Sequence, residues 1–189
     1  MGSTARRDAP EPQGPDTLAA PRSPMSWADH AVPLAAALAV LVLDRLTKWW
    51  ALSSLRIVDP LTGTVRSRTV GLIPGALDFT YAENTGAAFS IFHNHPVILT
   101  AVSLTIAVAI FWWYWRAPRE HTGMRVALGL VLGGAIGNLI DRIVRGSVVD
   151  FIHAFWRNHH WPTFNVADSA ICVGIALLIL WSYREQKKK

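Results

Sequence analysis

The stretch from Pro96 to Trp115 is twenty residues long and contains no charged side chain. As a helix it would be about 30 Å long, which matches the hydrocarbon core of a bilayer. It closes with an unbroken aromatic run, 111–115, followed by Arg116. Aromatic belts of this kind mark the interface between membrane and water. This segment therefore predicts a helix that crosses a membrane.

Three other apolar segments accompany it. The chain is 51% apolar and only 16% charged, and its apolar runs lack the polar face that helices of a soluble core show. We expect an α-helical integral membrane protein with four transmembrane helices, at about 28–50, 96–115, 124–143 and 164–183, and with outer loops at 51–95 and 144–163. This membrane domain would cover 26–184, between a disordered tail at 1–25 and a basic cytoplasmic tail at 185–189.

The first span carries charges near one end. Its apolar core, 31–43, is shorter than the roughly 20 residues of a crossing, so the crossing must include Asp44, Arg45 and Lys48. Asp44 and Lys48 are four residues apart on one helical face, where they can neutralise each other.

The third span combines a small-residue face with a polar end. Gly129, Gly133 and Gly137 recur every four residues, a spacing that lets another helix approach closely. Polar residues at helical spacing then form one stripe at the end of the span: Asn138, Asp141, Arg142 and Arg145.

Lys and Arg near the spans predict the orientation. One side would carry eight of them and the other five; the eight are Arg22, Arg116, Arg119, Arg125, Arg184, Lys187, Lys188 and Lys189, and the five are Arg56, Arg66, Arg68, Arg145 and Arg157. Both termini are therefore expected in the cytoplasm. In this topology the unusual polar residues of the spans all lie toward the outer leaflet.

The first outer loop contains a β pattern. Residues 65–70 and 76–82 are rich in β-branched and aromatic side chains, and Pro74-Gly75 separates them as a turn. We expect a small extracytoplasmic sheet or hairpin between spans one and two.

Asp150 and Asp168 both fall close to the outer interface. Either one alone could be a helix cap or a solvated loop charge, but two carboxylates near one interface favour a functional pair. For Asp141 we prefer a structural pairing with Lys48 or Asp44. Arg142 could pair in the same way or hold a carbonyl or phosphate oxygen.

Other chemistries find little support. The sequence contains neither HExxH nor GxSxG, and a Ser–Lys dyad with Ser53 or Ser54 would compete with Asp44 for Lys48. The histidines of the expected outer loops are a weak candidate for a metal site; they are His93, His95, His153, His159 and His160. We expect neither a metal nor a cofactor. The net charge of +5 gathers partly beside the last span, which favours anionic lipid over nucleic acid as a partner.

With these residues the chain resembles the bacterial lipoprotein signal peptidases, also called signal peptidase II, over residues 28–183. Four segments in order carry the resemblance: Asp44 to Lys48, Glu83-Asn84-Thr85-Gly86-Ala87-Ala88-Phe89, Gly137 to Ile152, and Phe164 to Ala170.

The resemblance implies a monomeric aspartic endopeptidase of the bacterial inner membrane, with its active site near the outer leaflet. It would cut diacylglyceryl-modified prolipoproteins just before the lipidated cysteine. The resemblance implies that Asp150 and Asp168 are catalytic; that the substrate is lined by Asn84, Asn138, Arg142 and Asn165; and that support comes from Asp44, Lys48, Gly86 and Asp141.

The chemistry of two close carboxylates is consistent with a catalytic role for Asp150 and Asp168. Ionisation of both would be costly, so one of them keeps a proton. Such a pair can activate a water molecule for hydrolysis. Two alternatives stay open at this point: a small proton-linked transporter, and an adaptor that binds lipidated proteins without cleaving them.

Overall fold

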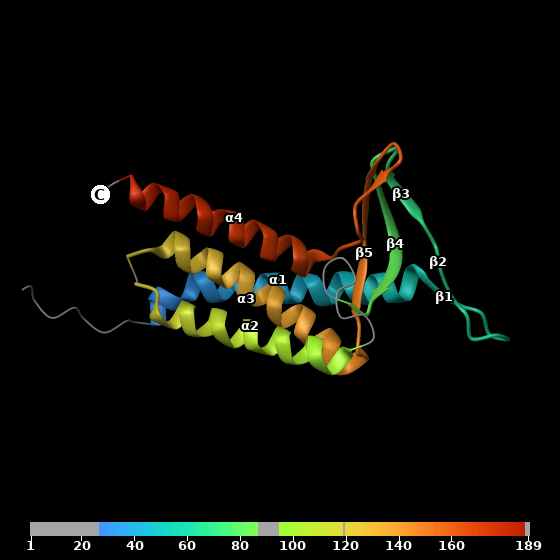
Figure 1. Ribbon diagram of the computed structural model, residues 1–189, viewed down its shortest axis with the longest axis horizontal. Coiled ribbons are helices and arrows are strands. Elements are labelled where there is room, and N and C mark those ends of the chain that lie inside the picture. The colour runs from blue at the N-terminus through green and yellow to red at the C-terminus, as the bar shows by residue number, and fades with distance from the viewer. Residues whose placement is uncertain (1–26, 87–94, 119, 188–189) are drawn as a thin grey trace, which may run out of the picture.

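Four long helices form the body of the molecule. The structure is a computed structural model, and it describes residues 27–86, 95–118 and 120–187. Within this part of the chain, four helices are long and apolar enough to cross a membrane. They run side by side along the molecule (Figure 1) and are α1 (Trp27–Ser54), α2 (Pro96–Arg116), α3 (Thr122–Arg145) and α4 (Val166–Gln186). The four expected spans are therefore present, each with somewhat different ends.

The largest difference in helix ends is in α1, which continues to Ser54 rather than stopping near Trp50. Ala51 has no exposed surface and the following Leu55 is almost as buried, because both pack beneath a strand of the outer loops. Tertiary contact thus extends the helix beyond the aromatic residues that mark an interface in the sequence.

The glycines of α3 lie against α1, as their spacing predicts. A Cβ atom built on Gly133 would lie 2.5 Å from the carbonyl oxygen of Ala37, and one on Gly129 would overlap the carbonyl oxygen of Pro33. Gly134 faces α4 in the same way, with its missing Cβ 2.5 Å from the Ala167 carbonyl oxygen. Helix α3 contacts all three other helices and is the most buried of the four. Because these glycines have no side chains, α1 and α4 can pack closely against α3.

The close approach at Gly133 predicts a large effect of one methyl group. Gly133→Ala should lower the melting temperature in detergent by several degrees, because the Ala37 backbone must move to accept the Cβ atom. Gly123→Ala is the matched control, since its Cβ would meet nothing within 4 Å, and it should melt at or above the wild-type temperature. Thermal unfolding of the purified variants is the measurement. Equal melting temperatures for the two variants would contradict the packing described here.

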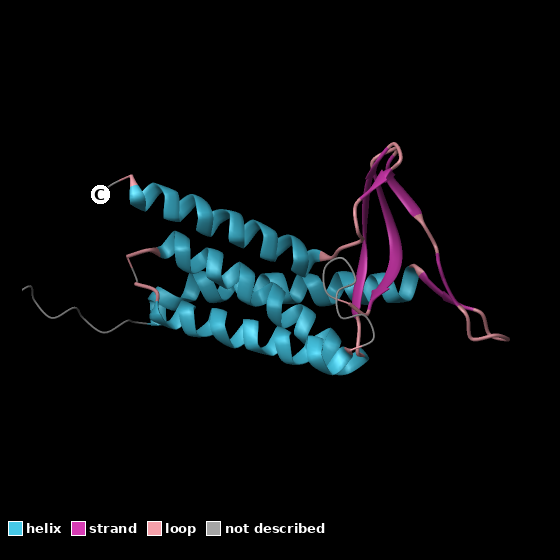
Figure 2. Cartoon of the chain, viewed as in Figure 1, coloured by secondary structure: helices cyan, strands magenta, loops and turns pink. Residues whose placement is uncertain are grey.

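Six strands stand at one end of the bundle (Figure 2). Strands β1 (Arg56–Val58) and β2 (Val65–Ser67) form an antiparallel ribbon. A four-stranded antiparallel sheet has the order β3-β4-β5-β6; its strands are β3 (Val70–Ile73), β4 (Leu77–Asn84), β5 (Val148–Trp156) and β6 (His159–His160). A hairpin lies around the expected turn, where Gly75 has a φ of +78°. Its second strand, β4, matches the expected 76–82, but its first strand is β3 rather than 65–70, most of which forms β2.

The sheet is larger than the expectation of a β element between spans one and two. Strands β5 and β6 come from the segment between α3 and α4, and β5 pairs along β4, with Ala82 opposite Asp150. The run Val148-Val149-Asp150-Phe151-Ile152 is rich in β-branched residues and carries a strand signal that the interpretation of this segment as a loop overlooked.

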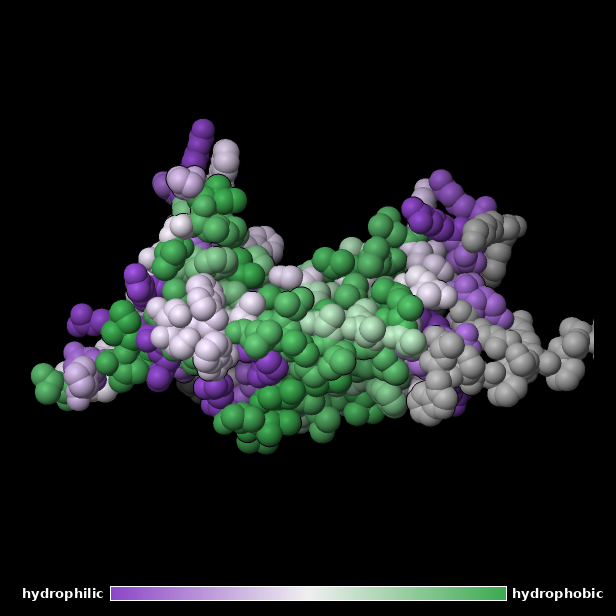
Figure 3. All heavy atoms as spheres, turned by 180° about the vertical axis from the view of Figure 1, so that it is seen from behind, coloured by the Kyte–Doolittle hydropathy of each residue, from purple (hydrophilic) through white to green (hydrophobic). Residues whose placement is uncertain are grey.

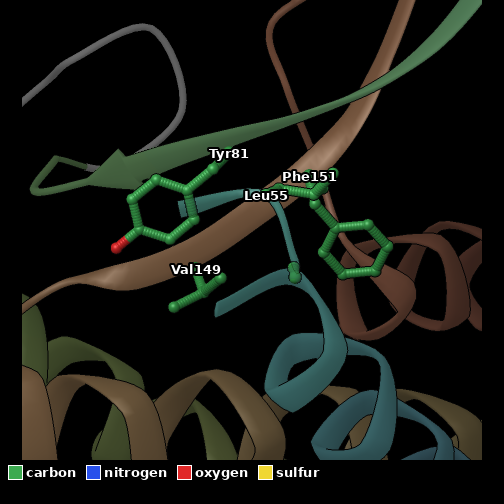
Figure 4. Close-up of a cluster of buried hydrophobic side chains, with 5 residues drawn as sticks. Leu55, Tyr81, Val149 and Phe151 are labelled. Atoms are coloured by element: carbon green, nitrogen blue, oxygen red, sulfur yellow. The ribbon is translucent and has the colours of Figure 1, made fainter. Parts of the chain in front are cut away.

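A hydrophobic cluster fixes the sheet to the bundle. Ala51 and Leu55 at the end of α1 pack with Tyr81 of β4 and with Val149 and Phe151 of β5 (Figure 4). Val149 and Phe151 lie on either side of Asp150 in the sequence, and both are at most 2% exposed. Burial of these neighbours holds the backbone of β5 in place at Asp150.

The surface of the bundle is apolar, whereas hydrophilic residues gather at its two ends (Figure 3). Large apolar side chains on the helices are widely exposed, including Val97, Trp112, Val173 and Ile179. A surface of this extent is not stable in water and is the surface expected against lipid. The helical region is therefore a membrane-spanning unit of several passes.

Candidate active site

Asp168 lies in the first turn of α4, where the local sequence orients its side chain. Asn165 is the N-cap of this helix, and its side-chain oxygen accepts a hydrogen bond from the Asp168 backbone N–H at 3.0 Å. The Asp168 carboxylate in turn accepts from the Asn165 backbone N–H at 3.2 Å. This reciprocal capping box directs the carboxylate back toward the start of the helix.

Asp150 lies on β5 and is only 1% exposed. Its two carboxylate oxygens accept from two different amides, Asn165 Nδ2 at 2.6 Å and Asn84 Nδ2 at 3.1 Å. Asn84 is at the end of β4, so a strand from the segment between α1 and α2 contributes directly to the environment of Asp150. Asn165 contacts both aspartates and links β5 to the start of α4.

Asn138 of α3 provides the second link. Its Nδ2 donates to Asp168 Oδ1 at 2.7 Å, while its Oδ1 accepts from Lys48 Nζ at 2.8 Å and from Asn165 Nδ2 at 3.3 Å. Because Lys48 can only donate, the amide oxygen of Asn138 must face Lys48 and its nitrogen must face Asp168. The orientation of this amide is thus determined by a buried cation.

Burial raises the pKa of Asp150 from its ordinary value of 3.8 to about 7, and the neighbouring negative charge of Asp168 adds to this increase. The hydrogen bonds from Asn84 and Asn165 favour the ionised form and act in the opposite direction. Desolvation outweighs them, so Asp150 remains largely protonated in mildly acidic solution and ionises only near neutral pH. The site therefore holds a proton that an ordinary surface aspartate would have lost.

A cluster of four charges lies beside this pair. Lys48 Nζ is 3.0 Å from Asp44 Oδ2 and 2.9 Å from Asp141 Oδ2, and these three side chains are at most 2% exposed. Arg45 contacts the same two carboxylates, at 2.7 Å from Asp44 and 2.8 Å from Asp141, and is 31% exposed. The two expected pairings, Asp44 with Lys48 and Asp141 with Lys48, are both present.

Arg142 and Gly86 complete the set of expected residues. Arg142 lies partly buried within reach of the charges of Asp150 and Asp168. Its buried Nε has no hydrogen-bond partner within the described ranges, and one Nη donates weakly to the Asn138 carbonyl at 3.5 Å. Gly86 is buried, and its N–H donates to Asn84 Oδ1 at 3.0 Å, which orients the amide that contacts Asp150. The rest of that motif, 87–89, lies outside the described residues.

The structure thus brings all ten expected residues to one region at the junction of helices and sheet. Arg45 was missed as a member of the buried cluster. A charge count gives the signal for it, because Asp44, Asp141 and Lys48 alone would leave one uncompensated negative charge at membrane depth. Among residues 27–86, 95–118 and 120–187, no three His, Cys, Asp or Glu side chains are grouped as a metal ion would need.

Comparison with known proteins places this site in context. The family model of signal peptidase II matches residues 36–184. A lipoprotein signal peptidase from Syntrophotalea carbinolica is 40% identical over 85% of this chain and 96% of its own length. Relatives of the same name from Symbiobacterium thermophilum and Acinetobacter baumannii are 41% and 39% identical, over 76% and 79% of this chain and 89% and 81% of their own lengths.

Two solved bacterial membrane enzymes share the fold. One superposes with a TM-score of 0.73 at 28% identity, over 84% of this chain and 92% of its own. The other has a TM-score of 0.66 at 30% identity, over 79% and 91%. Together with the paired aspartates, these matches define a peptidase of the aspartic type in the bacterial inner membrane. The chain belongs to the signal peptidase II family.

The raised pKa of Asp150 predicts how stability depends on pH. Between about pH 4 and 7 the folded protein holds a proton on Asp150 that the unfolded chain has released, so this residue lowers the free energy of unfolding as pH rises. Asp150→Asn removes that effect. The melting temperature of Asp150→Asn minus that of the wild type should therefore be more positive at pH 8 than at pH 5.

Thermal unfolding of both proteins in the same detergent at the two pH values gives this difference. A difference for Asp150→Asn that is constant with pH would contradict a buried, protonated Asp150.

Proposed function

We propose that Asp150 and Asp168 form the catalytic pair with which this peptidase cleaves diacylglyceryl-modified prolipoproteins just before the lipidated cysteine. The observation that carries the proposal is the shared hydrogen-bond network of the two carboxylates. Asn165 donates to Asp150 while its own backbone N–H is bound by Asp168. The pair also lies where the bundle meets the sheet, and a substrate anchored by acyl chains must present its scissile bond at such a membrane boundary.

The pair holds one proton in its active form. If both carboxylates were ionised, they would repel each other, because they are neighbours and largely shielded from water. The ionised carboxylate accepts a proton from a water molecule, whose oxygen attacks the scissile carbonyl carbon. The protonated carboxyl donates to the carbonyl oxygen and stabilises the developing charge. When the C–N bond breaks, a carboxyl proton passes to the leaving amine, and the signal peptide and mature lipoprotein separate.

The surrounding polar residues divide between two tasks. The amides of Asn138 and Asn165 are engaged by the aspartates and Lys48, which supports a role in orienting the pair as the substrate binds. Asn84 holds the second oxygen of Asp150 and extends from β4. The Arg142 Nε–H has no partner among the described residues, and the charge of this guanidinium acts on both carboxylates, so Arg142 is the side chain best suited to bind a substrate carbonyl oxygen.

The remaining assignments follow from the topology expected from the sequence. Both termini lie in the cytoplasm, and the sheet and the aspartates lie at the outer leaflet. The start of α1 and the end of α4 are at the end of the bundle away from the sheet (Figure 1), which supports this arrangement. The enzyme acts as a monomer in contact with membrane lipids. Four residues support the site: Asp44, Lys48, Gly86 and Asp141. The segment 1–25 is dispensable for activity.

Substitution of the aspartates tests the proposal. Asp150→Asn and Asp168→Asn should each lower the cleavage rate by at least about 1000-fold, because neither remaining carboxylate can act as both acid and base. The measurement is release of signal peptide from a synthetic lipidated prolipoprotein in detergent micelles. Asp78→Asn is the matched control and should cleave at the wild-type rate. If either dyad variant folds and turns over like the control, the catalytic assignment is wrong.

Thiol labelling tests the orientation. In a Cys172→Ala background, a cysteine placed at Leu61 or Asn158 should react with a membrane-impermeant reagent in cells whose inner membrane is intact. A cysteine at Gln186 should react only after the membrane is opened. All three positions are exposed, so accessibility of the side chain does not limit the reaction. The reverse pattern would place the aspartates at the cytoplasmic side and contradict the proposed topology.

A further inference from the structure

The buried carboxylates of Asp44 and Asp141 hold the backbone next to each proposed catalytic aspartate. Asp141 Oδ2 accepts from the backbone N–H of Val149 at 3.3 Å, and Val149 directly precedes Asp150. Asp44 Oδ1 accepts from the backbone N–H of Ala167 at 3.2 Å, and Ala167 directly precedes Asp168. The positions of strand β5 and helix α4 at the site therefore depend on two carboxylates from α3 and α1.

Two cations connect these carboxylates to each other. Lys48 reaches both Asp44 and Asp141 with a single ammonium group. Arg45 spans them with two different nitrogens: Nη2 is 2.7 Å from Asp44 Oδ2, and Nη1 is 2.8 Å from Asp141 Oδ1. Its Nη2 also donates to the Gly137 carbonyl at 2.9 Å, which ties the guanidinium to the backbone of α3.

The two cations are not equivalent. An ammonium is a point charge that tolerates many arrangements of its partners, whereas a planar guanidinium holds two carboxylates in a defined relative direction. Without Arg45, two buried carboxylates would share one positive charge, and their repulsion would favour a wider separation. If Asp141 moved, its hydrogen bond would displace the backbone of Val149, next to Asp150. If Asp44 moved, its hydrogen bond would displace the backbone of Ala167, next to Asp168.

We propose that Arg45 is a positioning residue that sets the spacing of Asp150 and Asp168, acting through Asp44 and Asp141. This inference rests on the proposed role of the two aspartates. No hydrogen bond or ion pair joins Arg45 to either aspartate among the described residues; its three hydrogen bonds go to Asp44, to Asp141 and to the Gly137 carbonyl.

The test compares the steady-state kinetics of Arg45→Gln, Arg45→Lys and the wild type on a lipidated prolipoprotein in detergent, across the pH range. Arg145→Gln is the matched control, because it removes the same charge from an exposed position at the outer end of α3. Asp150→Asn is included to establish that cleavage depends on the pair. Melting temperatures and folded yield are recorded for each protein.

Arg45→Gln should lower kcat about tenfold or more with little change in KM, since small displacements of catalytic groups are costly while substrate contacts are unaltered. Its pH–rate limbs should also move, because a changed spacing alters the interaction between the two ionisations of the pair. Arg45→Lys restores the positive charge but not the planar guanidinium, so it should recover only part of kcat and only part of the limb positions. Arg145→Gln should match the wild type in both respects.

Two outcomes overturn the inference. One is that Arg45→Gln equals Arg145→Gln in kcat and in its pH limbs. The other is that only its melting temperature falls while the folded enzyme keeps wild-type kinetics, which would mean a purely structural role. Should Arg45→Gln fail to fold, Arg45→Lys still decides the matter, because wild-type kcat in that variant contradicts the need for a guanidinium. Full cleavage by Asp150→Asn would instead overturn the proposed function and leave Arg45 without a pair to position.

Discussion

The burial of three charged side chains beside the aspartates, with a half-buried arginine as the fourth charge, is the constraint on which the rest of the site depends. Asp44, Lys48 and Asp141 have almost no access to water, and ions at membrane depth are stable only when they are paired and hydrogen-bonded. Pairing requires α1 and α3 to approach closely. The approach is possible because position 137 is glycine: a Cβ atom there would lie 2.7 Å from Asp44 Oδ2. The glycines of α3 are therefore needed for the ion pairs between α1 and α3 as well as for close helix packing.

Hydrogen bonds from this cluster position the two proposed catalytic aspartates, Asp150 and Asp168. Lys48 orients Asn138, which holds Asp168 at the start of a helix, while Asn165 connects that helix to Asp150 on a strand. A helix and a strand can present facing carboxylates only if their relative position is fixed. The hydrophobic cluster around Leu55 and Phe151 supplies that fixation on the sheet side. The location suits a lipid-anchored substrate, since the pair lies where the apolar helices meet the sheet.

Much of this could be predicted from the sequence. Uncharged runs and their aromatic ends predicted the four helices, glycine spacing predicted the close helix contact, and the four-residue spacing of Asp44 and Lys48 predicted their ion pair. The resemblance supplied the remaining site residues. The β-branched residues of β5 do carry a strand signal, but its pairing partner β4 is distant in the sequence, so the pairing itself could not be predicted from the loop alone. The role of Arg45 was missed because it depends on Asp141, which is 96 residues away.

The central claim is that the two aspartates share one proton near neutral pH. Infrared spectroscopy of protein with ¹³C-labelled aspartate carboxyls tests it most directly, because protonated and ionised carboxyls absorb at different frequencies. The account predicts a labelled band of protonated carboxyl at pH 6 that titrates near pH 7 in the wild type and is lost in Asp150→Asn. A wild-type enzyme without that band at pH 6, or an unchanged band in Asp150→Asn, would contradict the account.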